Sequence, residues 1–374
     1  MSWVECQLGD ILTLKRGYDL PHSARKSGRV PVVSSSGITG YHNTAKVEGP
    51  AVVTGRYGTL GEVYYVEGEC WPLNTSLYVQ DFKGNRPKFV YYFLQSVLKG
   101  MQSDKAAVPG VNRNDLHARK VKCTKDHDVQ VAVEKIISPY DDLIENNRRR
   151  IQLLEESARL LYQEWFVHLR FPGHEQVNIV DGLPEGWKNM QLTDIAKVNQ
   201  ASLKKGFDEK IEYIDISCVS THSISDTTWY EFIDAPGRAR RIVQHCDILW
   251  SCVRPNRRSH ALVWEPHDRL IASTGFAVIS ATEVSPLFLY QSLTTNEYVG
   301  YLTNRAGGAA YPAVTARVFE ESSILVPTKN LVEQYERQVQ DTYTQINILR
   351  TQNIKLAQAR DLLLPKLMSG ELTV

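Results

Sequence analysis

The chain has 374 residues, of which 43% are apolar and 23% charged, a composition that excludes a collagenous, wholly disordered or disulfide-scaffold protein. At roughly 100–200 residues per domain, this length suggests two or three domains. The 43 basic and 42 acidic side chains give a formal charge of +1, which excludes a uniformly basic protein that coats nucleic acid.

The cellular setting is predicted from what the sequence lacks. The six cysteines include no C-x-x-C pair, so we expect neither a zinc site nor a disulfide framework. No apolar run is long enough for a membrane span, and residues 1–5 do not resemble the start of a signal peptide. We therefore expect a cytoplasmic protein with no membrane partner.

The N-terminal motif W-x-x-x-Q-L-x-D-I at residues 3–11 recurs at residues 187–195. Three further correspondences follow in the same order along the chain. The number of residues between the two copies of each motif changes slowly, as loop insertions in a duplicated unit would produce. The three correspondences pair residues 92–96 with 288–292, residues 106–111 with 309–314 (A-A-x-P-x-V), and Ala158-Arg159 with Ala359-Arg360. The sequence therefore predicts two copies of one module.

Each module contains short β-type runs and one helical pattern, which indicates an α+β fold. The expected strands lie at residues 51–53, 63–66, 211–216 and 271–279, and the expected helices at residues 87–98 and 286–301. Between the modules, Pro/Gly clusters at residues 171–175 and 181–186 predict a linker.

Each module is followed by a long helical pattern with apolar residues at coiled-coil spacing. The first seam consists of Ile137, Tyr140, Ile144, Asn147, Ile151, Leu154, Ala158, Leu161 and Trp165, and the second of Tyr335, Val339, Thr342, Ile346, Leu349, Asn353, Leu356 and Leu363. A helix of this length with an apolar stripe needs a partner. We expect the two helices to pair, with Asn147 and Asn353 specifying the register; the alternative is that each helix packs on its own module.

Catalytic motifs are absent from the sequence. It contains no G-x-x-x-x-G-K-[ST] phosphate loop, no G-x-S-x-G elbow and no H-E-x-x-H metal pair. A binding protein is therefore favoured over two alternatives, an enzyme with a divergent site and a coiled-coil scaffold that binds only protein.

Candidate recognition residues occur in polar, glycine-hinged loops. The first module has such loops at residues 34–42 and 54–59, with Asn112-Arg113 after the A-A-x-P-x-V motif. The second module has basic clusters at residues 238–241 and 254–258. Arginine and asparagine on loops suit contacts to bases and phosphates, although ordinary turns and solvated surface are the competing explanation.

Taken in order, these motifs resemble the specificity (S) subunits of type I restriction–modification systems. The resemblance covers essentially the whole chain. It includes residues 139–151, 160–166, 183–187 and 359–372, besides the repeated opening and the loops at 34–41 and 54–61. The chain is shorter than many family members, so we expect reduced recognition domains.

The resemblance implies two similar target-recognition domains separated by a long antiparallel two-helix coiled coil, with an internal pseudo-two-fold repeat. It places domain 1 at residues 1–128, a spacer helix at 129–170, the linker and domain 2 at 171–328, and a second spacer helix with its tail at 329–374. Such a chain would be a non-catalytic subunit that binds double-stranded DNA with a bipartite sequence. Its partners would be two modification (methyltransferase) subunits and the restriction subunits. No cofactor is expected on this chain, because S-adenosylmethionine, ATP and Mg²⁺ would bind the partner subunits.

The DNA contacts that follow from this interpretation are assigned to ten side chains. They are Ser34, Ser36, Arg56, Tyr57, Asn112, Arg113, Arg254, Arg257, Arg258 and Tyr311. The sequence does not separate base contacts from phosphate contacts, and it does not give the target sequence.

Overall fold

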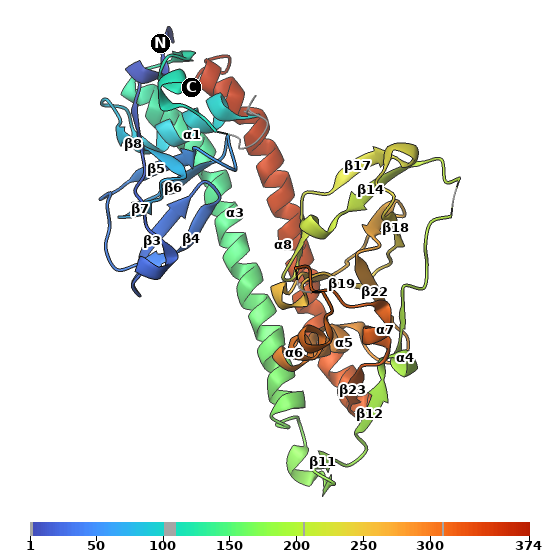
Figure 1. Cartoon of the computed structure of the whole chain (residues 1–374). Helices are drawn as coiled ribbons and strands as arrows, with labels where there is room; N and C mark the ends of the chain where they lie inside the picture. The colour runs from blue at the N-terminus through green and yellow to red at the C-terminus, as the bar shows by residue number, and fades with distance from the viewer. Residues whose placement is uncertain (1–2, 101–109, 205, 309) are drawn as a thin grey trace. The chain divides into compact units, whose positions relative to one another are not determined.

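The structure is a computed structural model that describes residues 3–100, 110–204, 206–308 and 310–374. It mixes helices and strands, as the sequence predicts, and it divides into two compact units (Figure 1). Unit 1 comprises Met1–Asn147 and Thr351–Val374, and unit 2 comprises Arg148–Arg350. None of the helices within the described residues is long and apolar enough to cross a membrane.

Unit 1 is built on a four-stranded sheet with the order β2-β8-β5-β6. Its strands are β2 (Thr13–Arg16), β5 (Ala51–Gly55), β6 (Val63–Val66) and β8 (Ser76–Asp81). A second sheet has the order β4-β3-β7, and a separate antiparallel pair joins β1 to β9. These strands are β1 (Val4–Gln7), β3 (Val30–Ser34), β4 (Gly37–His42), β7 (Trp71–Pro72) and β9 (Lys120–Cys123).

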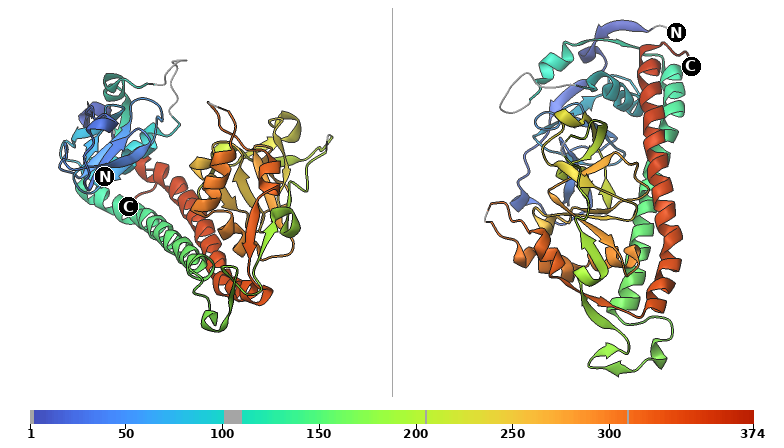
Figure 2. Two further views of the ribbon diagram at one scale, coloured as in Figure 1. Left: turned by 60° about the horizontal axis from the view of Figure 1, so that its bottom comes forward. Right: turned by 90° about the vertical axis from the view of Figure 1, so that its right-hand side faces the viewer.

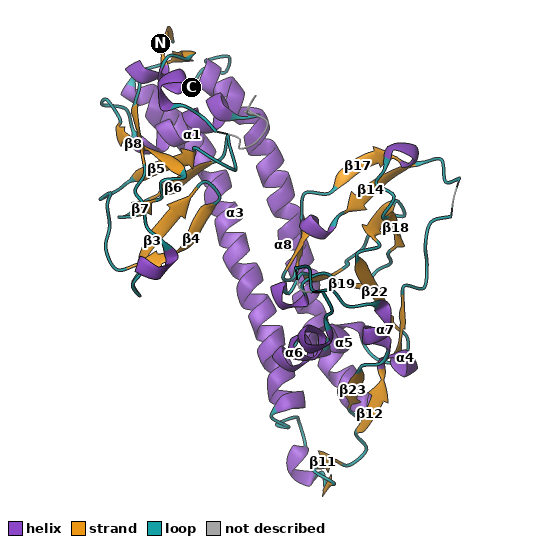
Figure 3. Ribbon diagram, in the orientation of Figure 1, coloured by secondary structure: helices purple, strands orange, loops and turns teal. Residues whose placement is uncertain are grey.

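Helix α1 (Pro87–Leu98) covers β5 and β6 in unit 1 (Figure 3). Proline suits its first position because the missing N–H would have no intrahelical acceptor there. Phe89, Phe93 and Leu94 recur at helical spacing and are buried, so this face of α1 contributes to the core of unit 1. The sequence-predicted bounds of this helix are confirmed.

Both chain ends belong to unit 1 (Figure 2). The ring of Trp3 lies against Gly370, where a Cβ atom would come within 2.5 Å of the indole. Leu364, Leu367 and Met368 belong to the same apolar cluster as Leu8 and Ile11.

Unit 2 has a four-stranded sheet of corresponding order, β13-β22-β19-β20. Its strands are β13 (Ala196–Val198), β19 (Ile248–Ser251), β20 (His260–Leu262) and β22 (Phe276–Ala281). The second sheet has the order β17-β14-β21-β18, with β14 (Lys210–Ile214), β17 (Thr228–Glu231), β18 (Ala239–Ile242) and β21 (Leu270–Ser273). Short antiparallel pairs are β10 (Ile179–Val180) with β11 (Leu183–Pro184), β12 (Lys188–Gln191) with β23 (Ser323–Val326), and β15 (Val219–Ser220) with β16 (Ser223–Ile224).

The repeated W-x-x-x-Q-L-x-D-I motif forms the same local structure in both units. In unit 1 the backbone N–H of Gln7 donates to the Asp10 carboxylate at 2.9 Å, and in unit 2 Gln191 donates to Asp194 at 3.1 Å. Each pair closes a capping box at the start of a helical turn that follows the strand. The motif therefore ends a strand and begins a turn in both units.

Three of the sequence-predicted elements of unit 2 are wrong in extent. The expected strand at 211–216 ends at Ile214, because Asp215 caps the 3-10 helix Ile216–Cys218. The expected strand at 271–279 is two strands, β21 and β22, because Thr274-Gly275 separates them. The expected helix at 286–301 is two helices, α5 (Pro286–Ser292) and α6 (Asn296–Arg305). The break arises because the Thr295 hydroxyl accepts from the Tyr298 N–H at 3.1 Å and begins a new helix.

The long helices are α3 (His127–Tyr162), followed by the π-helical turn Gln163–Val167, and α8 (Lys329–Ser369). Both pass from one unit into the other, so we describe their contacts unit by unit. In unit 1, Asp141 contacts Arg360 and Asn147 contacts Asn353, which is an antiparallel arrangement. In unit 2, the Tyr335 hydroxyl donates to the Ala158 carbonyl at 3.1 Å. The helices thus pair within each unit.

Candidate nucleic-acid interface

Arg56 and Tyr57 follow directly on β5 in unit 1. Their backbone N–H groups both donate to the Thr75 carbonyl, at 2.9 and 3.1 Å, which fixes the turn after the strand. The Arg56 guanidinium lies over the Tyr57 ring, 4.5 Å from its centroid, and the tyrosine is 40% exposed. Stacking of this kind holds a guanidinium in place and leaves its in-plane donors available.

Gly110 brings the next candidate segment against this pair. It forms a β-bridge with Tyr57, and the Val111 N–H donates to the Arg56 carbonyl at 2.9 Å. A Cβ atom at residue 110 would lie 2.6 Å from Cε1 of Tyr57, so glycine permits this approach with the ring in its present place. The residues that follow, Asn112 and Arg113, are thereby held beside Arg56.

Asn112 begins helix α2 (Arg113–His117). Its side-chain oxygen accepts from the Asn114 N–H at 3.0 Å, which is an N-cap contact. Arg113, the first residue of this helix, is exposed.

Three arginines line one surface hollow of about 570 Å³ in unit 1: Arg16, Arg56 and Arg113. Tyr57, Leu77 and residues 110–112 complete its lining, and no acidic residue occurs among these described lining residues. Arg16 was not predicted from the sequence. It ends β2, and the pair Lys15-Arg16 at a strand end is the only signal for it.

Ser34 and Ser36 belong to the turn between β3 and β4. Ser34 is buried; its hydroxyl accepts from the Ser36 N–H at 3.1 Å and donates to the Gly37 carbonyl at 3.2 Å. The Ser36 hydroxyl lies 3.0 Å from it. Both side chains are therefore engaged in shaping the hairpin. The first A-A-x-P sequence, residues 106–109, falls outside the described residues.

In unit 2, Arg254 lies beyond β19 in a left-handed backbone conformation (φ 50°) and precedes the short 3-10 helix Pro255–Arg257. Its N–H donates to the Pro312 carbonyl at 2.7 Å. Its guanidinium lies 4.7 Å from the ring centroid of Tyr311, which is 70% exposed. Arginine and tyrosine stack here as they do in unit 1.

The Arg254–Arg258 loop also contains a fixed arginine and an exposed one. Nη2 of Arg258 donates to the side-chain oxygen of Asn296 on α6 at 2.6 Å. Arg257 is exposed. Asn296 was not predicted, because nothing in the sequence links it to residue 258. The basic cluster at 238–241 lies on and beside β18, in the other sheet of unit 2.

The two arginine–tyrosine pairs stand on equivalent backbone but not at equivalent positions. Val111 donates to the Arg56 carbonyl in unit 1, and Val314 donates to the Cys252 carbonyl in unit 2, both at 2.9 Å. Cys252 therefore occupies the place of Arg56. In unit 2 the stacked pair is supplied instead by Arg254 and by Tyr311, from a loop distant in sequence.

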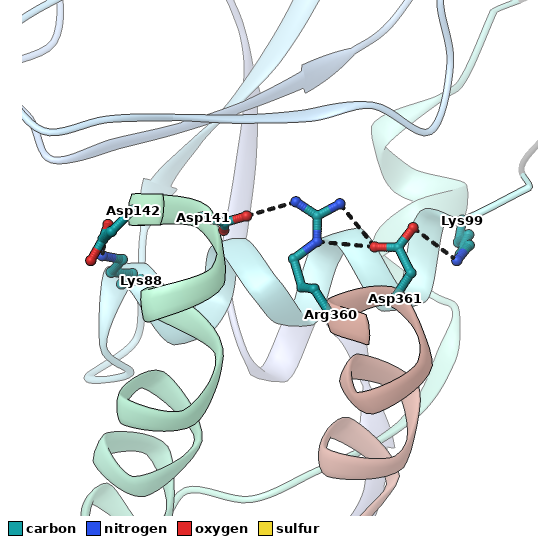
Figure 4. A network of polar contacts seen from close by, with 6 residues as sticks. All are labelled: Lys88, Lys99, Asp141, Asp142, Arg360 and Asp361. Carbon is teal, nitrogen blue, oxygen red and sulfur yellow. Dashed lines mark hydrogen bonds and ion pairs between the residues drawn. The ribbon is translucent and has the colours of Figure 1, made fainter. Parts of the chain in front are cut away.

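A polar network joins the helix pair to the rest of unit 1 (Figure 4). Arg360 of α8 donates to Asp141 of α3 at 2.6 Å and to Asp361 at 2.8 Å. Asp361 in turn lies 3.7 Å from Lys99, which follows α1, and Asp142 lies 3.8 Å from Lys88 on α1. Arg360, which interrupts the apolar seam, thus links α8 to α3, while Asp142 and Asp361 link the two helices to α1 and to Lys99.

Apolar side chains are also exposed on the outer faces of the long helices. In unit 1 they are Ile136 and Leu143 on α3 with Ile354 and Leu362 on α8, and in unit 2 they are Leu153 and Leu160 on α3 with Ile348 on α8. They are additional to the seams that join α3 to α8. Among the described residues, no three His, Cys, Asp or Glu side chains gather as a metal site.

Residues 1–156 match the family model described as the type I restriction modification DNA specificity domain. This stretch of the chain is therefore similar to type I DNA specificity domains. The matched residues include β1 to β9, the three arginines of the hollow and most of α3. The resemblance predicted from the sequence is confirmed.

About two thirds of the chain is similar in sequence to specificity subunits of type I restriction enzymes. The specificity subunit of the type I restriction enzyme MjaIX of Methanocaldococcus jannaschii is 23% identical over an alignment of 255 residues, which covers 66% of this chain and 59% of that protein. That of the HindI enzyme of Haemophilus influenzae is 25% identical over 314 residues, covering 66% of this chain and 68% of that protein. The type I S subunit from M. genitalium shares the fold, with a TM-score of 0.58 and 16% identity over 98% of this chain and 96% of that chain.

Proposed function

We propose that the chain is the DNA-recognition subunit of a type I restriction–modification complex and that it recognises a bipartite sequence. Residues 1–128 contact one half of the sequence and residues 171–328 contact the other. One observation carries the proposal: in each unit a guanidinium stacked on an exposed tyrosine follows the corresponding strand, β5 or β19. The proposal includes a pseudo-two-fold repeat of the domains, which would match the two-fold symmetry of duplex DNA.

The chemistry of both surfaces suits duplex DNA. A fixed guanidinium donates two parallel hydrogen bonds to O6 and N7 of guanine in the major groove, or to a phosphate. Arg56, Arg113, Arg254, Arg257 and Arg258 are the proposed base or phosphate contacts, and Arg16 joins them. Ser34, Ser36 and Asn112 hold the contact loops in shape, while Tyr57 and Tyr311 support their arginines.

The spacer helices at 129–170 and 329–374 form the proposed antiparallel coiled coil, and they dock two methyltransferase subunits. Each unit exposes its own apolar residues on these helices, so there is one docking face in each unit. The partner subunits then catalyse methyl transfer and restriction. S-adenosylmethionine, ATP and Mg²⁺ bind the modification and restriction subunits, and this chain is a non-catalytic, cytoplasmic component.

Methylome sequencing tests the proposal. The chain is co-expressed with a modification subunit of the proposed complex, and the methylated positions are mapped on genomic DNA. Methylation at two different half-sequences separated by a fixed gap is expected. Arg56→Ala should reduce the discrimination between bases in one half of the DNA sequence, and Arg254→Ala in the other half. Each loss should be about 1–3 kcal/mol. Methylation at a contiguous site, or methylation independent of sequence, contradicts the proposal.

Replacing Leu153 and Leu160 by serine tests the docking face of unit 2. Because both side chains are exposed, the free energy of unfolding of the chain should change little. The number of methyltransferase subunits bound, measured by native mass spectrometry, should fall from two to one. Retention of two subunits by this variant contradicts the assignment of that face.

A further inference from the structure

Arg350 of α8 makes polar contacts with two other parts of unit 2. Its Nη2 donates to the Glu155 carboxylate on α3 at 2.6 Å and to the backbone carbonyl of His222 at 2.5 Å. The side chains of Arg350 and Glu155 are only 31% and 18% exposed. One nitrogen thus connects the helix pair with the turn between β15 and β16.

That turn also holds the Arg254–Arg258 loop. The hydroxyl of Thr221, the neighbour of His222, donates to the backbone carbonyl of Arg258 at 3.0 Å. The His222 N–H donates to the His260 carbonyl at 2.8 Å. A continuous series of hydrogen bonds therefore runs from Glu155 and Arg350 through residues 221–222 to Arg258.

The interior side of the turn is fixed by a buried cluster. Nδ1 of His222 lies 2.6 Å from the hydroxyl of Tyr290, and Nδ1 of His260 lies 3.3 Å from the same hydroxyl. Burial lowers the pKa of His222 to about 4, and the charges of Arg350 and Arg159 add to this effect. Because the imidazole is neutral and Nδ1 lies close to the hydroxyl, His222 can accept a hydrogen bond from Tyr290. A shift of the turn would break this hydrogen bond.

We infer that Arg350 is a positioning residue for DNA recognition, because it sets the place of the Arg254–Arg258 loop relative to the spacer helices. The inference rests on the proposed function, since it assigns a role toward one half of the DNA sequence. The inference goes beyond the proposed function, because recognition of that half of the DNA sequence then depends on Arg350, a side chain on the docking helices. Arg350 does not itself touch DNA.

The arrangement in unit 1 differs and provides a contrast. Arg360 also joins α8 to an acid of α3, but its further contact leads through Asp361 to Lys99 at the end of α1. The hydrogen bonds of Arg56 and Tyr57 are made instead to Thr75 and Val111. Loop positioning through the helix arginine is therefore a property of unit 2.

The test uses the full complex of this chain with its modification subunits. Affinity is measured for the cognate duplex and for duplexes with single base changes in each half. The variants are Arg350→Met, Arg350→Lys, Thr221→Val and the double variant Arg350→Met/Thr221→Val. Arg337→Gln, an exposed arginine on the same helix, is the matched control. The half of the DNA sequence in which Arg254→Ala reduces discrimination is taken as the half that unit 2 contacts.

Arg350→Met should reduce discrimination about tenfold in the unit 2 half and leave the other half unchanged. Thr221→Val should have a severalfold effect of the same kind, and the double variant should be no worse than Arg350→Met, because both changes interrupt one path. Arg350→Lys should restore part of the discrimination, since an ammonium group can bond to one of the two acceptors. Arg337→Gln should behave as the wild type.

Equal losses in both halves, or additive effects of the two changes, would overturn the inference and leave the proposed function intact. A wild-type complex without discrimination in either half would instead contradict the proposed function and, with it, the inference. Thr221 is exposed, so its valine variant keeps the test decisive where Arg350→Met fails to fold.

Discussion

The side-chain amides of Asn147 on α3 and Asn353 on α8 are hydrogen-bonded to each other, with Nδ2 of Asn147 3.0 Å from Oδ1 of Asn353. Asn147 is only 6% exposed, and Ile144 beside it in the seam is equally buried. A polar pair in an apolar seam is satisfied only when its two members are opposite each other. It therefore selects one register of the antiparallel helices at some cost in stability.

Replacing Asn147 by leucine should destabilise unit 1, because the partly buried amide of Asn353 then has lost its hydrogen-bonding partner. We expect a loss of about 1–3 kcal/mol in the free energy of unfolding, measured by urea denaturation. The double variant Asn147→Leu/Asn353→Leu should recover this loss or exceed the wild-type stability, since two apolar residues then meet. A double variant less stable than either single one would show that the amide pair is net stabilising.

Gly110→Ala should remove the support for the Arg56–Tyr57 pair without altering any charge. The new methyl group would lie within 2.8 Å of two Tyr57 ring atoms, so the ring must move. We expect this variant to lose discrimination at the same base positions as Arg56→Ala in the methylome assay. Gly68→Ala is the control, since a Cβ atom there meets no atom within 4 Å.

Arg360→Met should weaken the link between α3 and α8 in unit 1. It leaves Asp141 without its 2.6 Å ion pair, and the carboxylate is only 24% exposed. Hydrogen bonds to charged groups are worth about 1.5–3 kcal/mol, and we expect a loss in this range by urea denaturation. Arg360→Met/Asp141→Leu should recover most of it. If the double variant is as unstable as the single one, Asp141 is not the partner that matters.

The sequence predicts the two long helices well because their apolar spacing is local and periodic. The seam residues Ile137, Ile144 and Ile346 are all buried, as their heptad spacing requires. Strand extents in unit 2 were less predictable. The expected strand at 271–279 has an apolar pattern with no proline. It is divided at Thr274-Gly275 because β21 and β22 pair with strands of two different sheets; the Thr274 N–H donates to the Arg238 carbonyl at 2.8 Å.

The candidate site was predictable only where its members are neighbours in sequence. Arg56 and Tyr57 are adjacent, so their association follows from the glycine-hinged loop. Arg254 and Tyr311 were each predicted, but their stacking depends on the backbone bond from Arg254 to Pro312. Arg16 and Asn296 were missed, since sheet pairing and the placement of α6 bring them to the site. The predicted domain boundaries at 128, 170 and 328 stay a prediction.

Acidification should destabilise unit 2 through its buried histidines. Burial lowers the pKa of His222 to about 4 and that of His260 to about 3, from an ordinary value of 6.5. Above pH 6.5 both imidazoles are neutral in the folded and the unfolded chain, and stability is unaffected. Between pH 6.5 and about 4 only the unfolded chain takes up these protons, so each histidine costs up to about 1.4 kcal/mol per pH unit.

Glu155, which is near this cluster, affects the pH dependence of stability in the opposite sense to the histidines. Burial raises the pKa of Glu155 above its ordinary 4.5 despite the charge of Arg350, so the folded chain gains a proton there as the pH falls. The double variant His222→Gln/His260→Gln separates the two effects. Its urea-unfolding free energy should be lower than that of the wild type at pH 7 but should fall less steeply from pH 6.5 to pH 4. Equal slopes for the two proteins would mean that the histidines are protonated in the folded chain and that the Tyr290 hydroxyl is not donated to either of them.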